Sequence, residues 1–189
     1  SARAEAEAPI RYDLPLAVRG TDTRLVLVRR GSGYVYSSTA SSAPAGGEGA
    51  VVNVAFLDAS GTRLLLDRPA FIRRVRYPGR ASEALSDSAL GWIVYEMALK
   101  DTNADATVDD RDRRSLYVTG LDGRGLRQVL PDGYELRDWA PQPDGSLVAT
   151  GLALTDMRQH AFRVDAGGVK PLAALDSAAA AAARISGSR

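Results

Sequence analysis

The residues with the clearest capacity for chemistry lie in the segment DTNADATVDDRD, at positions 101–112. Its oxygen-bearing side chains recur at alternate positions, as in EF-hand-type loops, whose ligands come from positions 1, 3, 5, 7, 9 and 12. With Asp101 as position 1, these places are filled by Asp101, Asn103, Asp105, Thr107, Asp109 and Asp112. Calcium prefers oxygen ligands, and position 7 supplies only a backbone carbonyl. The spacing therefore predicts a structural Ca²⁺ site.

Two residues of this segment depart from the EF-hand pattern. Ala106 stands at position 6, where Gly normally permits a left-handed backbone, and Asp112 replaces the longer Glu at position 12. Both departures predict weak calcium binding. In the alternative interpretation no metal binds, and the carboxylates are neutralised by the neighbouring cations Lys100, Arg111, Arg113 and Arg114.

The composition restricts the other kinds of chemistry. The 189 residues include 24 Lys and Arg against 23 Asp and Glu, a net charge of +1 that gives no general attraction to nucleic acid. The absence of Cys excludes thiolate metal sites, disulfides and a cysteine nucleophile. His160 is the single histidine, so it has no histidine partner, and we expect it to be dispensable. No apolar run approaches the roughly 18 residues of a membrane-spanning helix.

The elements that must position the acidic segment are predominantly strands. Short runs of Val, Leu, Ile and Tyr are separated by Gly, Asp-Gly and Pro, a pattern typical of antiparallel sheets. It predicts strands over 25–30, 51–57, 63–66, 71–77, 92–99, 115–121, 126–130, 134–139, 146–154 and 161–164. Helix is expected only as a turn or two over 82–88 and in the alanine-rich tail, where Ser177 is the predicted N-cap.

Three hairpins along the chain follow a common pattern. In each, a strand leads to an Asp that is followed within three residues by Gly, and a second apolar strand comes next. The Asp residues are Asp58, Asp122 and Asp165, at turn positions where a carboxylate can accept a hydrogen bond from its own backbone. Two further strands precede the second and third hairpins. The repeat therefore predicts units of four strands.

Residues 134–173 carry a family resemblance. Trp139, Pro141, Pro143, Asp144 and Gly145 link two strands, and Asp165, Gly167 and Gly168 link the next two. This stretch is similar to the WD-like repeats of the TolB propeller domain, although Ala140 replaces a familiar Ser and Gln142 is extra. The resemblance is looser over 71–130. It implies a β-propeller-like fold and a binding surface, but no particular reaction.

We therefore expect an all-β fold, a propeller-like array of about three four-stranded antiparallel units that is incomplete or open. The expected organisation is a flexible arm (1–10), the β-domain with its calcium loop (11–176) and an Ala-rich tail (177–189). The small-residue segment 37–49 is expected to be a linker. Exposed sheet edges should be covered by the arm, the tail or a second copy, and a monomer with covered edges is favoured.

Individual side chains within the strands have structural interpretations. Trp92 and Trp139 are expected to pack in the core, and Glu96, alone in an apolar strand, is expected to pair with an Arg on the next strand. In FIRRVRYP, arginines fall on both faces of the strand, which predicts a solvated edge strand; they are Arg73, Arg74 and Arg76.

The sequence favours a non-enzymatic calcium-binding interaction module with a protein partner, in the periplasm, the cell envelope or another exported compartment where calcium is abundant. The alternative is an extracytoplasmic hydrolase or lyase with a catalytic calcium and Asp/Glu acid–base chemistry. For that function, the nearest candidate residues outside the loop are Asp156 and His160, with Thr155 as the available nucleophile.

Overall fold

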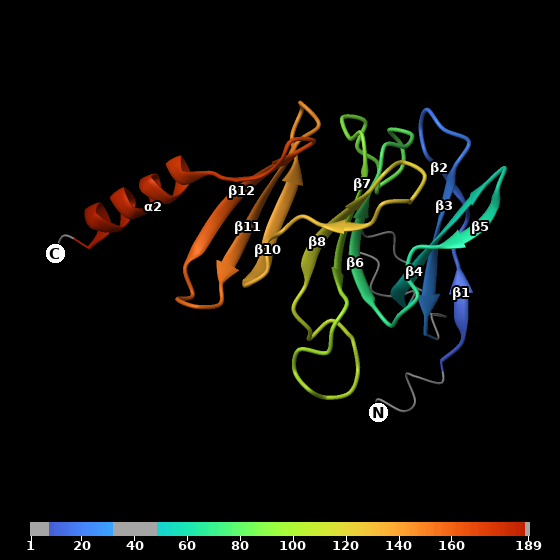
Figure 1. Cartoon of the computed structure of the whole chain (residues 1–189), viewed down its shortest axis with the longest axis horizontal. Coiled ribbons are helices and arrows are strands. Elements are labelled where there is room, and N and C mark those ends of the chain that lie inside the picture. Colours follow the sequence, from blue (N-terminus) through green and yellow to red (C-terminus); the bar gives the residue numbers. More distant parts are fainter. Residues whose placement is uncertain (1–7, 32–48, 188–189) are drawn as a thin grey trace, which may run out of the picture.

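The computed structural model describes residues 8–31 and 49–187, which form an antiparallel β-structure with a C-terminal helix (Figure 1). The all-β expectation is confirmed for this part of the chain. The expected linker 37–49 lies outside the described residues except for Gly49, as do residues 1–7 of the expected arm.

The strands fall into three consecutive antiparallel units. The first unit comprises β1 (Ile10–Tyr12), β2 (Leu16–Ala17), β3 (Arg24–Arg30), β4 (Ala50–Asp58) and β5 (Gly61–Leu64). The two short strands β1 and β2 pair with the two ends of β3. The second comprises β6 (Phe71–Arg76), β7 (Ile93–Ala98), β8 (Ser115–Thr119) and β9 (Arg127–Gln128). The third comprises β10 (Tyr134–Pro141), β11 (Leu147–Ala153), β12 (Gln159–Asp165) and β13 (Gly168–Pro171).

These units form two open sheets. A single residue pair, Val51 with Ile72, joins β4 to β6, so the first two units make one nine-stranded sheet. The third unit is a separate four-stranded sheet. The expected four-strand grouping is thus a separate sheet only in the third unit, and the acidic segment lies between β7 and β8 of the nine-stranded sheet.

The hairpin aspartates act as the sequence predicts. The Oδ1 atoms of Asp58, Asp122 and Asp165 each accept a hydrogen bond from the backbone N–H two residues ahead, at 2.8, 2.9 and 2.8 Å. Each of these bonds satisfies a backbone donor in a tight turn. The same local chemistry thus closes β4–β5, β8–β9 and β12–β13.

The hydrophobic core has two parts, and β7 contributes to both. Ile93, Tyr95 and Met97 pack in a cluster with the first unit, and Val94 packs in a cluster that extends into the third. All six residues of β7 are buried. Because both faces of this strand are covered, its sequence is apolar at every position except Glu96 instead of alternating. Trp139 is buried in the second cluster and Trp92 packs against it, as expected.

Two strands were not predicted, and one strand was assigned the wrong environment. The missed elements, β1 and β2, are three and two residues long. The expectation of an edge strand at FIRRVRYP is wrong, because β6 lies between β4 and β7. Arg74 can lie between sheets because Glu96 neutralises it and its guanidinium stacks 4.3 Å from the centre of the Trp139 ring.

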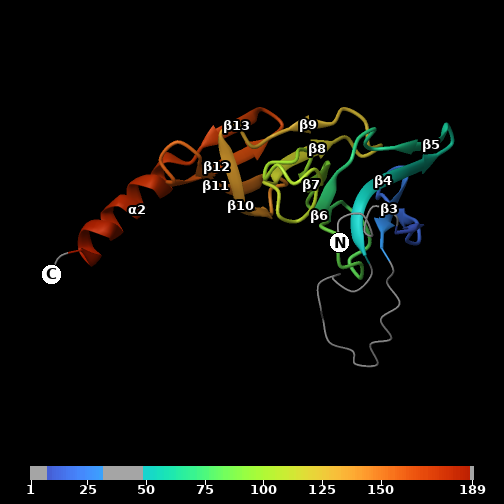
Figure 2. The same cartoon turned by 90° about the horizontal axis from the view of Figure 1, so that it is seen from below.

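The helix predictions also need correction. Helix α2 (Ala173–Ser186) begins before Ser177, and its N-cap is Leu172, so Ser177 is not the cap. The segment 82–88 contains turns and an isolated bridge to Tyr77 instead of helix. Helix α2 has no buried residues and extends away from the sheets, as Figure 2 also shows. It contacts β12, where the Leu172 N–H donates to the Ala161 carbonyl at 2.8 Å.

Candidate metal centre

The acidic loop, residues 101–112, connects two paired antiparallel strands. In β7 and β8, Ile93 lies opposite Thr119 and Met97 lies opposite Ser115, so the loop closes the open end of this pair. It projects below the sheets in Figure 1. Its placement in a β-hairpin, between a buried strand and its neighbour, agrees with the sequence interpretation and differs from a helix-loop-helix arrangement.

In the first half of the loop, the backbone curls around the Asp101 carboxylate. Asp101 Oδ1 accepts from the Asp105 N–H at 3.2 Å, and Oδ2 accepts from the Ala106 N–H at 2.7 Å. Two left-handed residues, Ala104 (φ 61°) and Ala106 (φ 68°), produce this curl. The left-handed conformation expected at position 6 is therefore present without a glycine, which strains the backbone there.

The next ligand positions are linked to one another. The Oδ1 of Asn103 accepts from the Asp105 N–H at 3.0 Å, and its Nδ2 donates to Asp105 Oδ2 at 3.1 Å. Asp105 Oδ1 in turn accepts from the Thr107 N–H at 3.0 Å. Alternate side chains thus follow the inside of the turn, each bonded to the backbone two residues ahead.

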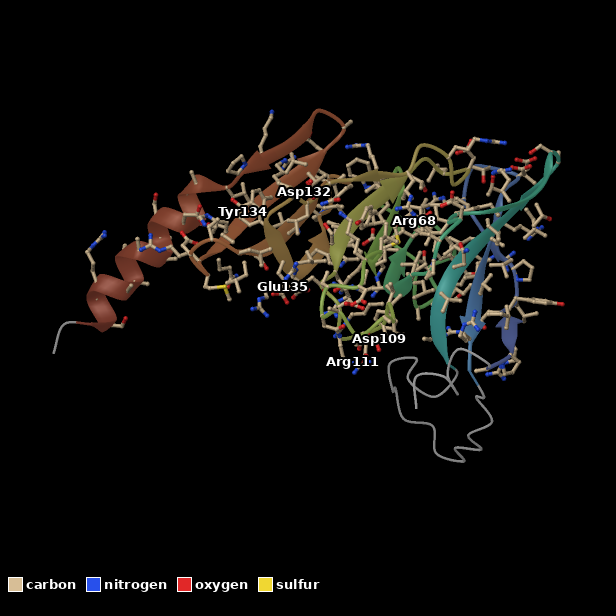
Figure 3. The ribbon with its side chains drawn as sticks, turned by 60° about the horizontal axis from the view of Figure 1, so that its bottom comes forward. Arg68, Asp109, Arg111, Asp132, Tyr134 and Glu135 are labelled. Atoms are coloured by element: carbon tan, nitrogen blue, oxygen red, sulfur yellow. The ribbon has the colours of Figure 1, made fainter. Side chains whose placement is uncertain are left out.

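A guanidinium connects the two halves of the loop. One Nη2 atom of Arg111 lies 2.8 Å from Asp105 Oδ2 and 2.5 Å from Asp109 Oδ2. Arg111 Nε also donates to Asp109 Oδ1 at 3.2 Å, and Figure 3 shows the two side chains next to each other. These contacts lower the pKa of Asp109 and raise that of Arg111, because each charge favours the other.

Asp112 is the buried residue of the set, with only 2% of its surface exposed. Its Oδ1 accepts from the Thr102 N–H at 2.6 Å and from the Thr102 hydroxyl at 3.0 Å, and its Oδ2 accepts from the Asp109 N–H at 2.9 Å. Burial raises the pKa of Asp112, but these donors outweigh it, so the net pKa lies below the usual value. Asp112 therefore pins the start of the loop to its end.

The six predicted ligands thus share one loop, but the carboxylates of the four aspartates among them accept from backbone donors and from Arg111. Within residues 8–31 and 49–187, no three His, Cys, Asp or Glu side chains are grouped to hold one metal ion. No family model or curated protein matches this chain. The TolB-like resemblance and the calcium assignment accordingly stay predictions. In the same described part, no helix is long and apolar enough to cross a membrane.

The residues considered for an enzymatic alternative are held by other partners. His160 Nδ1 lies 3.3 Å from Asp176 of α2, and Asp156 Oδ1 accepts from the Arg158 N–H at 3.0 Å. The arrangement thus pairs His160 with the helix and closes a turn with Asp156.

The sequence interpretation missed two contributors to the loop. It treated Arg111 as one of four neighbouring cations, although this is the one that bridges Asp105 and Asp109. It also gave no role to Thr102, whose hydroxyl accepts from the Arg113 N–H at 2.9 Å and donates to Asp112. The available signal for Thr102 was its position directly after the first acid, where hydroxyl side chains commonly bond the backbone of turns.

Proposed function

We propose that this chain is a non-enzymatic, calcium-binding interaction module of the cell envelope or periplasm, with three consecutive blades of a β-propeller-like array. In this proposal the Ca²⁺ is structural, with side-chain ligands from Asp101, Asn103, Asp105, Asp109 and Asp112 and a carbonyl from Thr107. The module binds a protein partner and catalyses no reaction.

The loop backbone is the observation that carries the calcium assignment. Position 6, Ala106, has the left-handed conformation that the ligand spacing requires, and its N–H points at the carboxylate of position 1. The acids at positions 5 and 9 face one shared cation, the Arg111 guanidinium. A divalent ion can replace that guanidinium if Arg111 turns outward, because the side chain is 62% exposed.

The blade assignment is supported by the strand order. One five-stranded and two four-stranded antiparallel units follow one another along the chain, with Asp-containing hairpins closing their last two strands. The second unit is packed on both faces, against the first and the third. Repeated antiparallel sheets packed face to face are typical of propellers, and the fold serves many binding functions.

Competition between calcium and Arg111 provides the test. Thermal unfolding is measured in chelator and at calcium concentrations up to several millimolar, since the weakened positions 6 and 12 place the expected dissociation constant at about 10⁻⁵–10⁻³ M. At several millimolar calcium the folded chain should gain about 1 kcal/mol if the constant is near 10⁻³ M, and about 2.7 kcal/mol or more if it is about a hundredfold below the calcium concentration. Arg111→Gln should bind calcium several-fold more tightly, because the ion no longer displaces a guanidinium.

Two variants complete the design. Asp105→Ala removes a central ligand and should abolish the thermal shift. Arg113→Gln is the control: Arg113 is exposed, and only its backbone N–H, which the substitution keeps, donates to the loop. The variant should therefore bind calcium with the same affinity as the wild type. If the wild type and Arg111→Gln melt identically in chelator and in millimolar calcium, arginine alone balances these carboxylates and the calcium proposal is wrong.

A further inference from the structure

The first unit of strands lies at the end of the molecule opposite α2, as Figures 1 and 2 both show. One face of its sheet packs on the second unit, and Leu25 and Leu27 of β3 belong to that contact. Side chains at the alternate positions point away from the second unit, because successive residues of a strand face opposite sides of a sheet. We call this outer side of the first unit the end face.

The strand register identifies the residues of the end face. In β3 they include Arg24, Val28 and Arg30, which alternate with the residues that face the core. In β1, Ile10 lies opposite Arg30 and Tyr12 lies opposite Val28. Residues directly opposite each other in antiparallel strands share a face. Ile10 and Tyr12 therefore belong to the end face.

Three apolar side chains project on this side. The pairing continues beyond β1, because the Asp13 N–H donates to the Leu27 carbonyl at 2.9 Å, and Leu14 then lies on the same side as Tyr12. Ile10, Tyr12 and Leu14 are 51%, 81% and 83% exposed. Single exposed apolar residues are ordinary, but three at alternate positions form a projecting apolar edge. Tyr joins an apolar ring to a polar hydroxyl, a combination enriched where membranes meet water.

The charge of this part of the chain is positive. Residues 8–31 contain five Arg and two Asp, without Lys or Glu. The first of these acids is paired with Arg29, at 2.9 Å, on the opposite face of the sheet. Arg24 and Arg30 therefore give the end face a positive charge that Asp22 offsets only in part.

An open hollow of about 440 Å³ borders the end face. Its lining contains no acid and consists of Ala17, Arg19, Gly79, Arg80 and Ala81. Ala17 lies opposite Arg24, which places the hollow beside the end face. Among the residues that the structure describes, the guanidinium groups of Arg19 and Arg80 form no hydrogen bond or ion pair.

The hollow is part of the packed structure. The Arg19 N–H donates to the Pro78 carbonyl at 2.8 Å and so joins the two segments that line it. Glu83, the acid nearby in sequence, has its carboxylate bonded to the Tyr77 hydroxyl and to the Arg80 N–H. It therefore neutralises neither guanidinium by direct pairing. Two such groups in one hollow suit a phosphate, whose oxygens can accept from both.

We infer that the end face binds the surface of a bilayer that contains anionic phospholipids. Headgroup phosphates bind Arg19 and Arg80, and the side chains of Ile10, Tyr12 and Leu14 enter the layer beneath the headgroups. These side chains form a projecting edge and no pocket, which suits a fluid lipid surface better than a rigid protein partner. The positive charge adds attraction to the anionic surface. This function is separate from the calcium site and from the protein partner proposed above.

The test measures co-sedimentation of the full chain with vesicles of phosphatidylcholine, either pure or with one third phosphatidylserine. Chelator is present throughout, so that calcium cannot bridge the loop to the lipid. The chain should bind the anionic vesicles at least about tenfold more tightly, and binding should weaken several-fold when salt is raised from about 0.1 to 0.5 M. Equal binding to both vesicles, or binding to neither, would overturn the inference.

Two soluble probes distinguish the bilayer from other anionic ligands. Millimolar glycerol phosphate should release only part of the chain from anionic vesicles, because it replaces the headgroup contacts and not the inserted side chains. Complete release would show that phosphate alone is the ligand. Polyglutamate should bind more weakly than anionic vesicles of equal total charge. Tighter binding to polyglutamate would assign the end face to an acidic protein, and either result would contradict the bilayer.

Matched variants locate the contact. Leu14→Ser and Arg19→Gln should each weaken binding to anionic vesicles by about fivefold or more. Both residues are exposed, so these variants should unfold at the same urea concentration as the wild type. Leu154→Ser and Arg158→Gln, exposed residues between β11 and β12, should bind as the wild type does. Equal effects in the two sets, or no effect in either, would overturn the assignment to the end face.

The calcium and membrane proposals can fail separately. Asp105→Ala should lose the calcium response and keep its binding to anionic vesicles, because the loop lies outside the end face. A chain that binds vesicles without any response to calcium contradicts only the calcium assignment. A chain that responds to calcium and ignores anionic vesicles contradicts only the membrane inference.

Discussion

Replacing Glu96 with Ala should strongly destabilise the contact between the two sheets. Glu96 is buried in β7, with 4% of its surface exposed. Its Oε1 accepts a hydrogen bond from Arg114 Nε at 3.3 Å. Its Oε2 lies 3.4 Å from Arg74 Nε, close enough for an ion pair, but the geometry of this second contact is not that of a hydrogen bond. Oε2 also accepts from Trp139 Nε1 of β10 at 3.3 Å. The Glu96 carboxylate thus pairs with two arginines and accepts a hydrogen bond from the third unit.

The size of the effect follows from what the deletion leaves behind. Removing one partner of a buried ion pair typically costs about 3–5 kcal/mol, because the remaining charge stays desolvated. Here Arg74 and Arg114 are 31% and 20% exposed, so water reaches both and the lower end, about 3 kcal/mol, applies. For a chain of this length, about 2–4 °C per kcal/mol gives a fall in melting temperature of about 6–12 °C.

The assay is urea unfolding at neutral pH, with calorimetric melting as a second measurement. Glu96→Gln keeps the shape and one acceptor, so it should lose less than Glu96→Ala. Glu135→Ala, on the neighbouring β10 and only half-buried, is the matched control and should change the unfolding free energy by less than about 0.5 kcal/mol. If Glu96→Ala is as stable as Glu135→Ala, water solvates Glu96 and the sheet contact described above is wrong.

Three further substitutions test the loop and the helix. Asp112→Asn should cost about 1.5–3 kcal/mol at neutral pH, because charged hydrogen bonds to Thr102 and Asp109 are lost. The pKa of Asp112 is lower in the folded state than in the unfolded state. Its contribution to stability is therefore full above the unfolded-state pKa of about 3.9 and disappears as the pH falls through the folded-state pKa. Urea unfolding across this range should show the unfolding free energies of the wild type and Asp112→Asn becoming equal in acid. Ala106→Gly should stabilise the chain by about 0.5–1 kcal/mol in the same assay by relieving the left-handed alanine, and a loss of stability would contradict that backbone. His160→Gln should fold normally and change the unfolding free energy by less than about 0.5 kcal/mol, since a half-exposed pair with Asp176 contributes little; a larger loss of stability would contradict its dispensability.

Much of the strand content could be predicted because burial and turn chemistry are local. The run that forms β7 is bounded by Gly91 and the polar loop, and the hairpin aspartates bond to their own backbone within two residues. By contrast, β2 is two residues long, pairs with β3 and packs against the first core cluster through Leu16, contacts that both come from residues distant in the sequence. No local pattern distinguishes such a strand from a loop. The helix start at Ala173 was missed because Leu172 makes no side-chain cap.

The candidate site was predictable in position but not in detail. Acids at alternate positions cannot continue a buried strand, so the loop had to follow β7. Arg111 neutralises the loop acids because the left-handed residues Ala104 and Ala106 turn the backbone so that Asp105 faces it. Alanine rarely adopts this conformation, so the sequence gives no sign of it. Likewise, an arginine on the next strand was expected for Glu96 and Arg74 confirms it, but the third partner, Trp139, comes from a different sheet.

The contacts of Arg114 explain why calcium should be detected as added stability and not as a large change of shape. Arg114 donates through Nη1 to the Asp110 carbonyl at 3.2 Å, while its Nε faces buried Glu96. An ion that draws Asp109 and Asp112 together must move the backbone that contains Asp110. That movement is limited by an arginine fixed to the core and by Asp112, which is itself buried. The free energy of binding therefore adds to that of the folded state, and the loop has little room to reorganise the sheets around it.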